Sequence, residues 1–300
     1  MRKIVILIIL FAFYLQANST LNYLNYQRKK SGLAPLKFNY TLKKAALHHA
    51  KYLALNDALS HDESPYLKAF YAKYPWDRVI KAGFPTRVVV ENISFYEKNY
   101  KASIDKLMGT VYHRLAFLDF RVDSIGFAKY NSRYVYEMSN SKIASICKKS
   151  FHAEFGVEGL CRDRSKILEQ RVYNKTILST LAKSKRVSFY PYRNQKNVPT
   201  HLVEERPIFL YGEYGFPITV RFNNYYINKV RLKKFALYEN NHKVPTKIVH
   251  QGNDLEQKLD EHTFVLVPLN PLKRKTKYKV VLQVKEDKRV KNYSWSFRTR

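Results

Sequence analysis

Hydrophobic residues recur at every third or fourth position in the first part of the chain, which is the spacing of one face of a helix. The pattern predicts helices over residues 21–30, from Asn39 or Thr41 to about Leu59, and over residues 102–118. Residues 124–128 and 133–138 follow as two short segments, the second with alternating side chains, and both are typical of strands. Helices interspersed with short strands favour an α+β fold.

The pattern changes after residue 190. Runs rich in β-branched and aromatic residues, at 218–222, 264–267, 278–282 and 295–297, are separated by turns that contain Asn, Gly, Asp or Pro. This alternation predicts an all-β sandwich over residues 191–300. Residues 141–190 have a weaker pattern, with a helix expected over 167–181 and a basic stretch at 183–186. We therefore expect a linker or helical extension between the two domains.

The N-terminus has the pattern of an export signal. Arg2 and Lys3 precede an apolar run over residues 4–15, and small residues fit a cut after Ser19. A run of this length is too short for a membrane-spanning helix, which needs about 20 apolar residues. We expect residues 1–19 to be removed and the protein to be periplasmic, displayed on the cell surface or secreted. Retention of the segment as an uncleaved anchor is the alternative.

Export leads to an oxidising compartment, where disulfides form. The chain has two cysteines, Cys147 and Cys161. They make up the single possible intrachain disulfide, and two free thiols are the alternative.

Charge changes this picture little. The chain holds 54 Lys and Arg against 24 Asp and Glu, a formal net charge of +30. The excess is spread over the whole chain, whereas a nucleic-acid-binding protein usually concentrates it on one element or stripe. We therefore expect no specific nucleic-acid partner. Peripheral attraction to anionic membrane surfaces and nonspecific binding of polyanions remain as alternatives.

Short motifs stand in a fixed order over residues 20–140. They are Asn25-x-x-Arg28-x-x-x-Gly32-Leu33, Leu42-x-x-x-Ala46-x-x-His49-Ala50, Leu59-Ser60-His61, Glu91-Asn92-Ile93, His113-Arg114-x-x-x-Leu118 and Ile125-Gly126-Phe127-Ala128. In this order and spacing they resemble the bacterial branch of the CAP superfamily (cysteine-rich secretory, antigen 5, pathogenesis-related 1; also called SCP). The resemblance implies a three-layer α-β-α sandwich with a central antiparallel sheet.

The C-terminal segment carries a second set of motifs. They are Gly215-Phe216-Pro217, Phe264-x-Leu266-x-Pro268, Pro271-Leu272-x-x-x-Thr276-x-Tyr278 and Trp295-x-Phe297-x-Thr299. They resemble a bacterial Ig-like domain of the kind found in exported and surface proteins. The resemblance implies a domain that positions or extends its partner, without chemistry of its own.

The CAP resemblance also implies a cleft site. His61 and His113 match the two cleft histidines, and Glu91 matches the glutamate between them. Thr110 stands where the family has a second acidic residue, and Val90 stands where it has a glycine before the glutamate. Asn92, next to Glu91, is included in the expected ligand cleft.

Two imidazoles and a carboxylate can be read in two ways. They can form an open three-ligand Zn²⁺ site whose bound water is activated for hydrolysis. Without a metal they form a polar network in which Glu91 fixes a histidine tautomer. We expect His49 to be a satisfied core or cleft-wall histidine, and Asp62 and Glu63 to lie in a solvated loop. The alternative is that Asp62 and Glu63, beside His61, supply a replacement for the missing cleft acid.

The sequence favours a non-enzymatic module that binds a ligand or a partner through the His/Glu cleft. The aromatic run from Tyr66 to Trp76 suits a lipid, a glycan or a peptide, and an envelope protein is a further candidate. The alternative is a metal-dependent hydrolase that uses His61, Glu91 and His113. Zn²⁺ is its one candidate cofactor, with His61 and His113 as the metal ligands.

Overall fold

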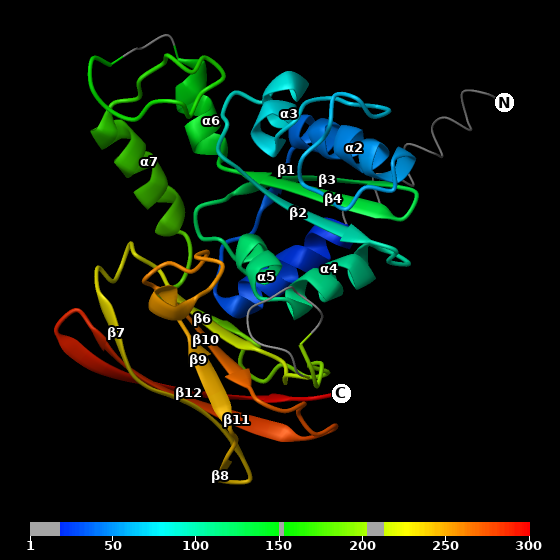
Figure 1. Cartoon of the computed structure of the whole chain (residues 1–300). Helices are drawn as coiled ribbons and strands as arrows, with labels where there is room; N and C mark the ends of the chain where they lie inside the picture. Colours follow the sequence, from blue (N-terminus) through cyan, green and yellow to red (C-terminus); the bar gives the residue numbers. More distant parts are fainter. Residues whose placement is uncertain (1–18, 150–152, 203–212) are drawn as a thin grey trace. The chain divides into compact units, whose positions relative to one another are not determined.

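The computed structural model describes residues 19–149, 153–202 and 213–300 (Figure 1). The expected signal segment lies outside these residues except for Ser19. The described chain forms two compact units. The first consists of residues 19–29, Pro35–Asp105 and Val122–Asn174, and the second of Lys30–Ala34, Lys106–Arg121 and Lys175–Arg300. Within the described residues, no helix is long and apolar enough to cross a membrane.

The first unit is built on a four-stranded sheet with the order β1-β3-β4-β2. A helical segment at 19–31 precedes it. The other elements are β1 (Lys37–Phe38), α2 (Tyr40–Leu55), α3 (Pro75–Ala82), β2 (Val89–Phe95), α4 (Tyr100–Gly109), β3 (Ser124–Tyr130), β4 (Arg133–Ser139), α6 (Ser141–Lys148) and α7 (Gln170–Leu181). The boundary between the units falls within α4 and α7.

Helices cover both faces of this sheet (Figure 1). On one face, Ala46, Ala50 and Leu53 of α2 form a buried cluster with Val135 of β4. On the other face, the Ser103 hydroxyl of α4 lies 2.7 Å from the Tyr136 hydroxyl of β4. Val135 and Tyr136 are neighbours, and neighbouring strand residues point to opposite faces. The α+β class with an α-β-α layering is thereby confirmed.

The cap expected for the second helix is present. The Asn39 side chain accepts hydrogen bonds from the backbone N–H groups of Thr41 and Leu42. The helix predicted over residues 102–118 is instead two helices, because α4 ends at Gly109 and α5 begins at Tyr112. The Thr110 hydroxyl donates to the Leu107 carbonyl (2.9 Å), which satisfies a backbone acceptor at the end of α4.

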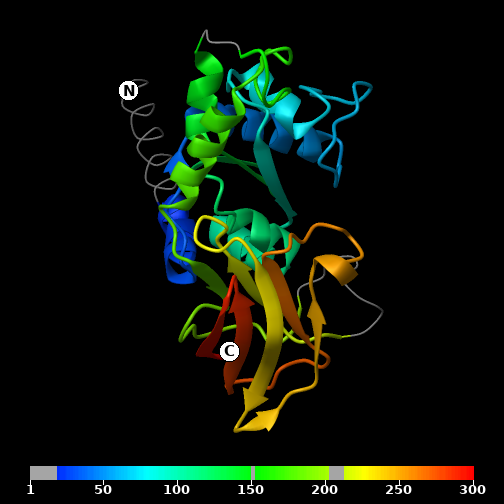
Figure 2. The ribbon, with the colours of Figure 1, turned by 90° about the vertical axis from the view of Figure 1, so that its left-hand side faces the viewer.

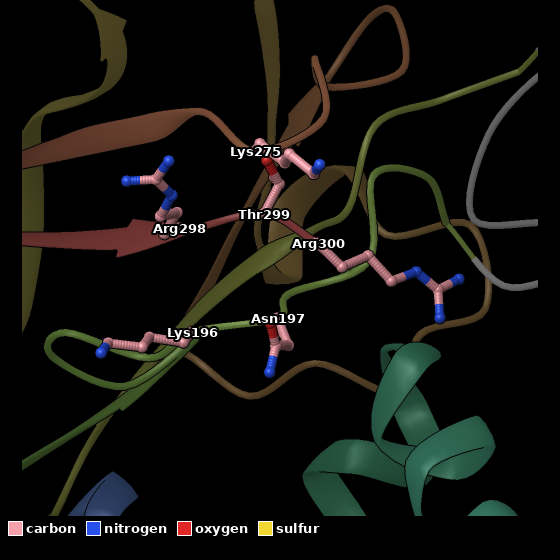
Figure 3. Close-up of a pocket in the computed structure, with 6 residues that line it drawn as sticks. All are labelled: Lys196, Asn197, Lys275, Arg298, Thr299 and Arg300. Atoms are coloured by element: carbon pink, nitrogen blue, oxygen red, sulfur yellow. The ribbon is translucent and has the colours of Figure 1, made fainter.

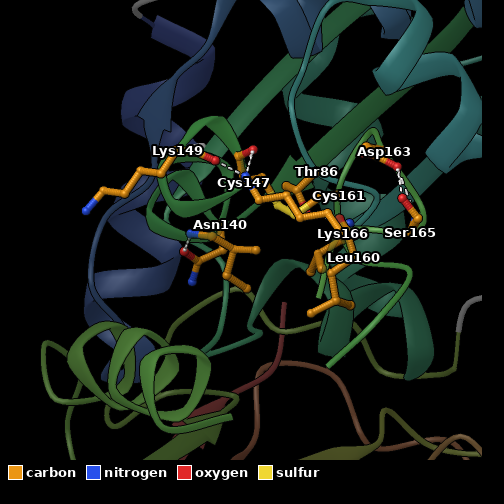
Figure 4. Close-up of a disulfide and its surroundings, with 11 residues drawn as sticks. Thr86, Asn140, Cys147, Lys149, Leu160, Cys161, Asp163, Ser165 and Lys166 are labelled. Atoms are coloured by element: carbon orange, nitrogen blue, oxygen red, sulfur yellow. Dashed lines mark hydrogen bonds between the residues drawn. A yellow bond between two sulfur atoms is a disulfide. The ribbon is translucent and has the colours of Figure 1, made fainter. Parts of the chain in front are cut away.

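A disulfide ties the segment after α6 to the first unit (Figure 4). Cys147, in α6, is bonded to Cys161, with their Cα atoms 5.3 Å apart. The Leu160 carbonyl accepts a hydrogen bond from the Thr86 hydroxyl (2.6 Å) and another from the Arg87 backbone (2.7 Å). The segment around Cys161 is therefore held beside the chain that enters β2.

The second unit contains two antiparallel four-stranded sheets, β5-β6-β10-β9 and β12-β11-β7-β8 (Figure 1 and Figure 2). Aromatic contacts join them, with ring centroids of Phe189 and Trp295 4.6 Å apart. This all-β region is consistent with the expected β-sandwich. Its elements are α5 (Tyr112–Phe117), β5 (Val187–Tyr190), β6 (Ile218–Phe222), β7 (Val230–Glu239), β8 (His242–Lys243), β9 (Thr246–Val249), η1 (Gln251–Asn253), β10 (Thr263–Pro268), β11 (Lys277–Glu286) and β12 (Arg289–Arg298).

The short helix α5 belongs to the second unit through Arg114. This side chain is fully buried and donates to the carbonyls of Met108 (2.8 Å) and Pro217 (2.7 Å). Its guanidinium carbon lies 4.7 Å from the ring centroids of both Tyr190 and Phe216. The compact units therefore do not follow the expected boundaries at 140 and 190, and the division into 20–140, 141–190 and 191–300 stays a prediction.

Candidate functional site

The site in the first unit begins with the face that α2 presents to the sheet. Leu42, Ala46, His49 and Leu53 follow each other at helical spacing and are buried. Helix α2 can lie this close because β3 has Gly126 at the point of contact. A Cβ atom at Gly126 would lie 2.0 Å from the Lys43 backbone nitrogen. This close approach places the buried His49 of α2 against the sheet.

Two glutamates occupy the sheet face that α2 covers. Strands β2 and β4 are antiparallel, and Glu91 is paired directly with Glu137. Glu137 lies two residues from Val135, so it points to the same face. Its side chain is fully buried, and that of Glu91 is 2 % exposed. Asn92 follows Glu91 and points to the opposite face, so the structure does not bring it to Glu91.

The loop between α2 and α3 completes a group that we call the carboxylate cluster. Its members are His49, His61, Glu63, Arg78, Glu91 and Glu137. Glu63 Oε1 lies 2.9 Å from His49 Nδ1, and its Oε2 accepts a hydrogen bond from the Tyr71 backbone (2.6 Å). Glu63 is therefore buried and hydrogen-bonded, and the expectation that it lies in a solvated loop is wrong.

Arg78 of α3 is the cation of the carboxylate cluster. Its side chain is fully buried, and Nη2 donates to Glu91 Oε2 and to the His61 carbonyl, both at 2.8 Å. Nη1 donates to the Lys73 carbonyl at 3.0 Å. A planar guanidinium can serve several acceptors at once, so Arg78 fixes Glu91 and the backbone of His61 together.

The two paired glutamates have opposite pKa shifts. Burial alone would raise the pKa of Glu91, but His49, His61 and Arg78 outweigh it and hold that pKa well below its usual range. Burial and the neighbouring Glu91 carboxylate raise the pKa of Glu137 well above its ordinary value. Two adjacent buried carboxyls rarely ionise together, so Glu91 carries the charge and Glu137 keeps its proton.

The raised pKa of Glu137 gives a pH-dependent prediction. Below its ordinary pKa of 4.5, Glu137 is protonated in the folded and unfolded chain. Above this pH only the unfolded chain loses the proton, so the folded state is disfavoured by about 1.4 kcal/mol per pH unit until the folded pKa is reached. Glu137→Gln removes this loss. In urea unfolding, the free energy of unfolding of this variant is expected to match that of the wild type near pH 4 and to exceed it at pH 7.

Glu158→Gln is the matched control for this prediction, because Glu158 is exposed in the same unit. Its stability relative to the wild type is expected to stay constant from pH 4 to pH 7. A Glu137→Gln variant that is less stable than the wild type at pH 7 would show that Glu137 is ionised in the folded protein.

His61 is the member of the carboxylate cluster that reaches solvent. Its side chain is 46 % exposed, and its Nδ1 lies 2.7 Å from Glu91 Oε1. Because the Glu91 carboxylate can only accept, Nδ1 carries the hydrogen and the neutral ring has its lone pair on Nε2. No described residue makes a hydrogen bond to that Nε2. The arrangement offers one oriented imidazole nitrogen to a ligand.

The structure places His113 in a different setting from His61. His113 is on α5, in the second compact unit, and its Nδ1 lies 3.1 Å from the Thr110 hydroxyl. Thr110 thus contacts the histidine from the position where the family has an acid. Among the described residues, no group of three or more His, Cys, Asp and Glu side chains is arranged to hold a metal ion. Zn²⁺ binding by His61 and His113 stays a prediction.

Sequence reasoning missed part of the carboxylate cluster. No helix was predicted around Arg78, yet this residue lies in α3. The signal was present, since α3 begins with Pro75 and ends before Gly83, which has a left-handed φ of 110°. For Glu137, the alternating pattern of β4 was the signal, because it places this carboxylate on the same face as Val135.

Comparison with known families identifies the first part of the chain. The model of the cysteine-rich secretory protein family, CAP, matches residues 21–147, and this segment belongs to that family. Comparison with curated proteins gives no match.

Several solved structures are similar to part of the chain. An extracellular protein containing an SCP domain from Bacillus anthracis is 21% identical, with a TM-score of 0.37 over 41% of this chain and 39% of that chain. An outer surface protein from Borrelia burgdorferi is 18% identical, with a TM-score of 0.37 over 41% of this chain and 91% of that chain. A cysteine-rich secretory protein from Staphylococcus aureus is 21% identical, with a TM-score of 0.33 over 41% of this chain and 38% of that chain. The match thus spans well under half of the first and third proteins.

Proposed function

We propose that this is an exported, non-enzymatic binding protein whose CAP domain holds a ligand at His61. The observation that carries the proposal is the imidazole itself. His61 is half exposed, its Nδ1 is fixed by a buried carboxylate at 2.7 Å, and its Nε2 has no partner among the described residues. Fixing one ring nitrogen sets the tautomer and orientation of the other. Such a nitrogen accepts a hydrogen bond from a neutral ligand, or donates to an anion once protonated.

Exposed aromatic and aliphatic side chains lie close to His61 in the sequence. Leu59 is 64 % exposed, Tyr66 is 94 % exposed and Trp76 is 40 % exposed. The rings of Tyr74 and Trp76 are stacked, with centroids 4.7 Å apart. Amphipathic rings of this kind provide contact area for lipids, glycans or peptides. They support a ligand that combines an apolar or stacking surface with one polar group for His61.

Calorimetric titration of the mature protein tests this proposal. The probes are a trimer of N-acetylglucosamine for glycans, dodecanoate below its critical micelle concentration for lipids, and trialanine for peptides. We expect saturable binding of at least one probe, and a loss of at least about tenfold in affinity, or 1.4 kcal/mol, in His61→Asn. Asn keeps a polar side chain but removes the imidazole.

His242→Asn is the control, because His242 is exposed on β8 of the second unit. It is expected to bind like the wild type. The proposal fails if no probe binds, or if His61→Asn binds as tightly as His242→Asn.

The alternative is a metal-dependent hydrolase, and the carboxylate behind His61 favours it. A histidine that ligates zinc usually donates its other ring N–H to a carboxylate, as His61 does to Glu91. Zinc would supply an activated water, but three ligating side chains do not gather among the described residues, so no reaction step follows. Calorimetric titration with Zn²⁺ distinguishes the metal-dependent hydrolase from the non-enzymatic binding protein. Uptake by the wild type that is lost in both His61→Ala and His113→Ala supports the alternative, and no uptake by the wild type excludes it.

A further inference from the structure

The second unit has a pocket at the end of its β-sandwich, formed by none of the residues of the carboxylate cluster. It has a volume of about 420 Å³ and is lined by Lys196, Asn197, Lys275, Arg298, Thr299 and Arg300. These residues come from three parts of the chain: the loop after β5, the turn before β11, and the end of β12. Figure 3 shows Thr299 and Asn197 between the cationic side chains, which fan outward on either side of them.

Backbone hydrogen bonds hold the three segments together. Arg298 donates to the Gln195 carbonyl (2.8 Å) and accepts from Val198 (3.1 Å), and Arg300 donates back to Val198 (3.0 Å). Lys275 donates to the Arg300 carbonyl (3.1 Å), which joins the third segment to the other two. Main-chain hydrogen bonds therefore hold Lys275, Arg298 and Arg300 in place, and Lys196 lies between two residues, Gln195 and Val198, that take part in the same bonds.

All four charged side chains that line this pocket are cationic. No lining residue is acidic, and none of the four cationic side chains makes a hydrogen bond or ion pair with a described residue. Some other cations of the unit are paired with carboxylates, as for Lys273 with Glu239 (2.9 Å) and Arg186 with Glu286 (2.7 Å). Like charges held around a concavity raise the local potential and attract anions.

The fold creates this concentration of charge from separate segments. Along the chain the basic excess is spread widely. Residues 273–277 are a run with four basic residues among five, but only Lys275 of this run lines the pocket. Lys196 lies almost 80 positions before it, and Arg298 and Arg300 lie more than 20 positions after it. A count of charge by segment therefore does not find the site.

We propose that this pocket binds a phosphate-bearing anion. Arginine and lysine together are the side chains that hold phosphate, the guanidinium through paired N–H bonds and the ammonium as a point charge. A volume of about 420 Å³ falls in the range of small-molecule sites. At about 30 Å³ per water molecule it has room for a group of two phosphates. The phosphate can come from a small soluble molecule or from the headgroup of an anionic lipid, and the experiment separates the two sources.

The test is a calorimetric titration of the mature protein with inorganic pyrophosphate at 150 mM salt. A second arm measures cosedimentation with vesicles of phosphatidylglycerol, against vesicles of phosphatidylcholine. Lys196→Gln/Lys275→Gln removes two pocket charges. The control Lys288→Gln/Lys291→Gln removes two exposed charges at the other end of the β11–β12 hairpin, and so has the same net charge.

Saturable pyrophosphate binding that weakens at least about tenfold in the pocket variant and not in the control supports a soluble phosphate ligand. If the pocket variant selectively loses phosphatidylglycerol binding without pyrophosphate binding, the ligand is a lipid headgroup. Both results uphold the pocket. Equal weakening in the two variants, or no saturable binding in either arm, overturns it and leaves only nonspecific attraction by the net charge.

Discussion

The variant Gly126→Ala is expected to lose about 3 kcal/mol of folding free energy or more, and to melt roughly 10 °C lower by circular dichroism. A Cβ atom at this position would lie 2.0 Å from the Lys43 nitrogen and 2.3 Å from the Leu42 carbonyl carbon, both backbone atoms of α2. Backbone atoms cannot swing aside as a flexible side chain can. The helix would have to move off the sheet, which opens the cluster of Ala46, Ala50 and Val135.

Gly252→Ala separates this steric effect from the general effect of replacing glycine. A Cβ atom at Gly252 would meet only the ring of the exposed His250, at 3.1 Å. Both substitutions reduce the conformational freedom of the unfolded chain equally, by less than about 1 kcal/mol. We expect Gly252→Ala to melt close to the wild type. If Gly126→Ala does so too, α2 does not lie as close to β3 as the structure places it.

The variant Arg78→Met is expected to lose about 3–5 kcal/mol, the usual cost of leaving a buried charge without its partner. Methionine keeps most of the apolar volume but removes the guanidinium that bonds Glu91, the His61 carbonyl and the Lys73 carbonyl. Glu91 would then keep only the imidazoles of His49 and His61 as basic neighbours, and its pKa would rise. Urea unfolding at pH 7 measures the loss.

Two further variants identify the cause. Arg164→Met removes an arginine that is 68 % exposed and lies 3.6 Å from Asp77, and an exposed pair of this kind contributes at most about 1 kcal/mol. Arg78→Met/Glu91→Gln removes both the cation and the charge it neutralises, so it is expected to be more stable than Arg78→Met. If adding Glu91→Gln lowers stability further, the loss comes from packing and not from an unpaired carboxylate.

The sequence predicted the framework around these residues better than the carboxylate cluster itself. Helical spacing and the Asn39 cap placed α2, and the ordered motifs identified the CAP segment. His61 and Glu91, which matched the family by position, do lie within hydrogen-bond distance of each other. Helical spacing and the helix cap depend on residues close together in the chain, and the order of the short motifs supplied the pairing of His61 with Glu91.

The partners of His61 and Glu91 were harder to predict, for a physical reason. Arg78 and Glu63 are charged residues in an aromatic, proline-containing stretch, and their sequence context is that of a solvated loop. Burial of such side chains becomes favourable only when opposite charges from different elements meet. Glu91 on β2, His49 on α2 and Arg78 on α3 meet through tertiary contacts, which no periodicity in a single segment encodes.

The burial of Arg114 has a consequence for how the protein can be divided. The CAP family match ends at residue 147, yet Arg114 within it donates to the Pro217 carbonyl and packs against the rings of Tyr190 and Phe216. A chain shortened to its family segment would lack Tyr190 and Phe216. The Arg114 guanidinium would then be exposed to water, and α5 would lose its aromatic neighbours. Genetic exchange of the N-terminal module alone is thus disfavoured, and the two halves are expected to be inherited together.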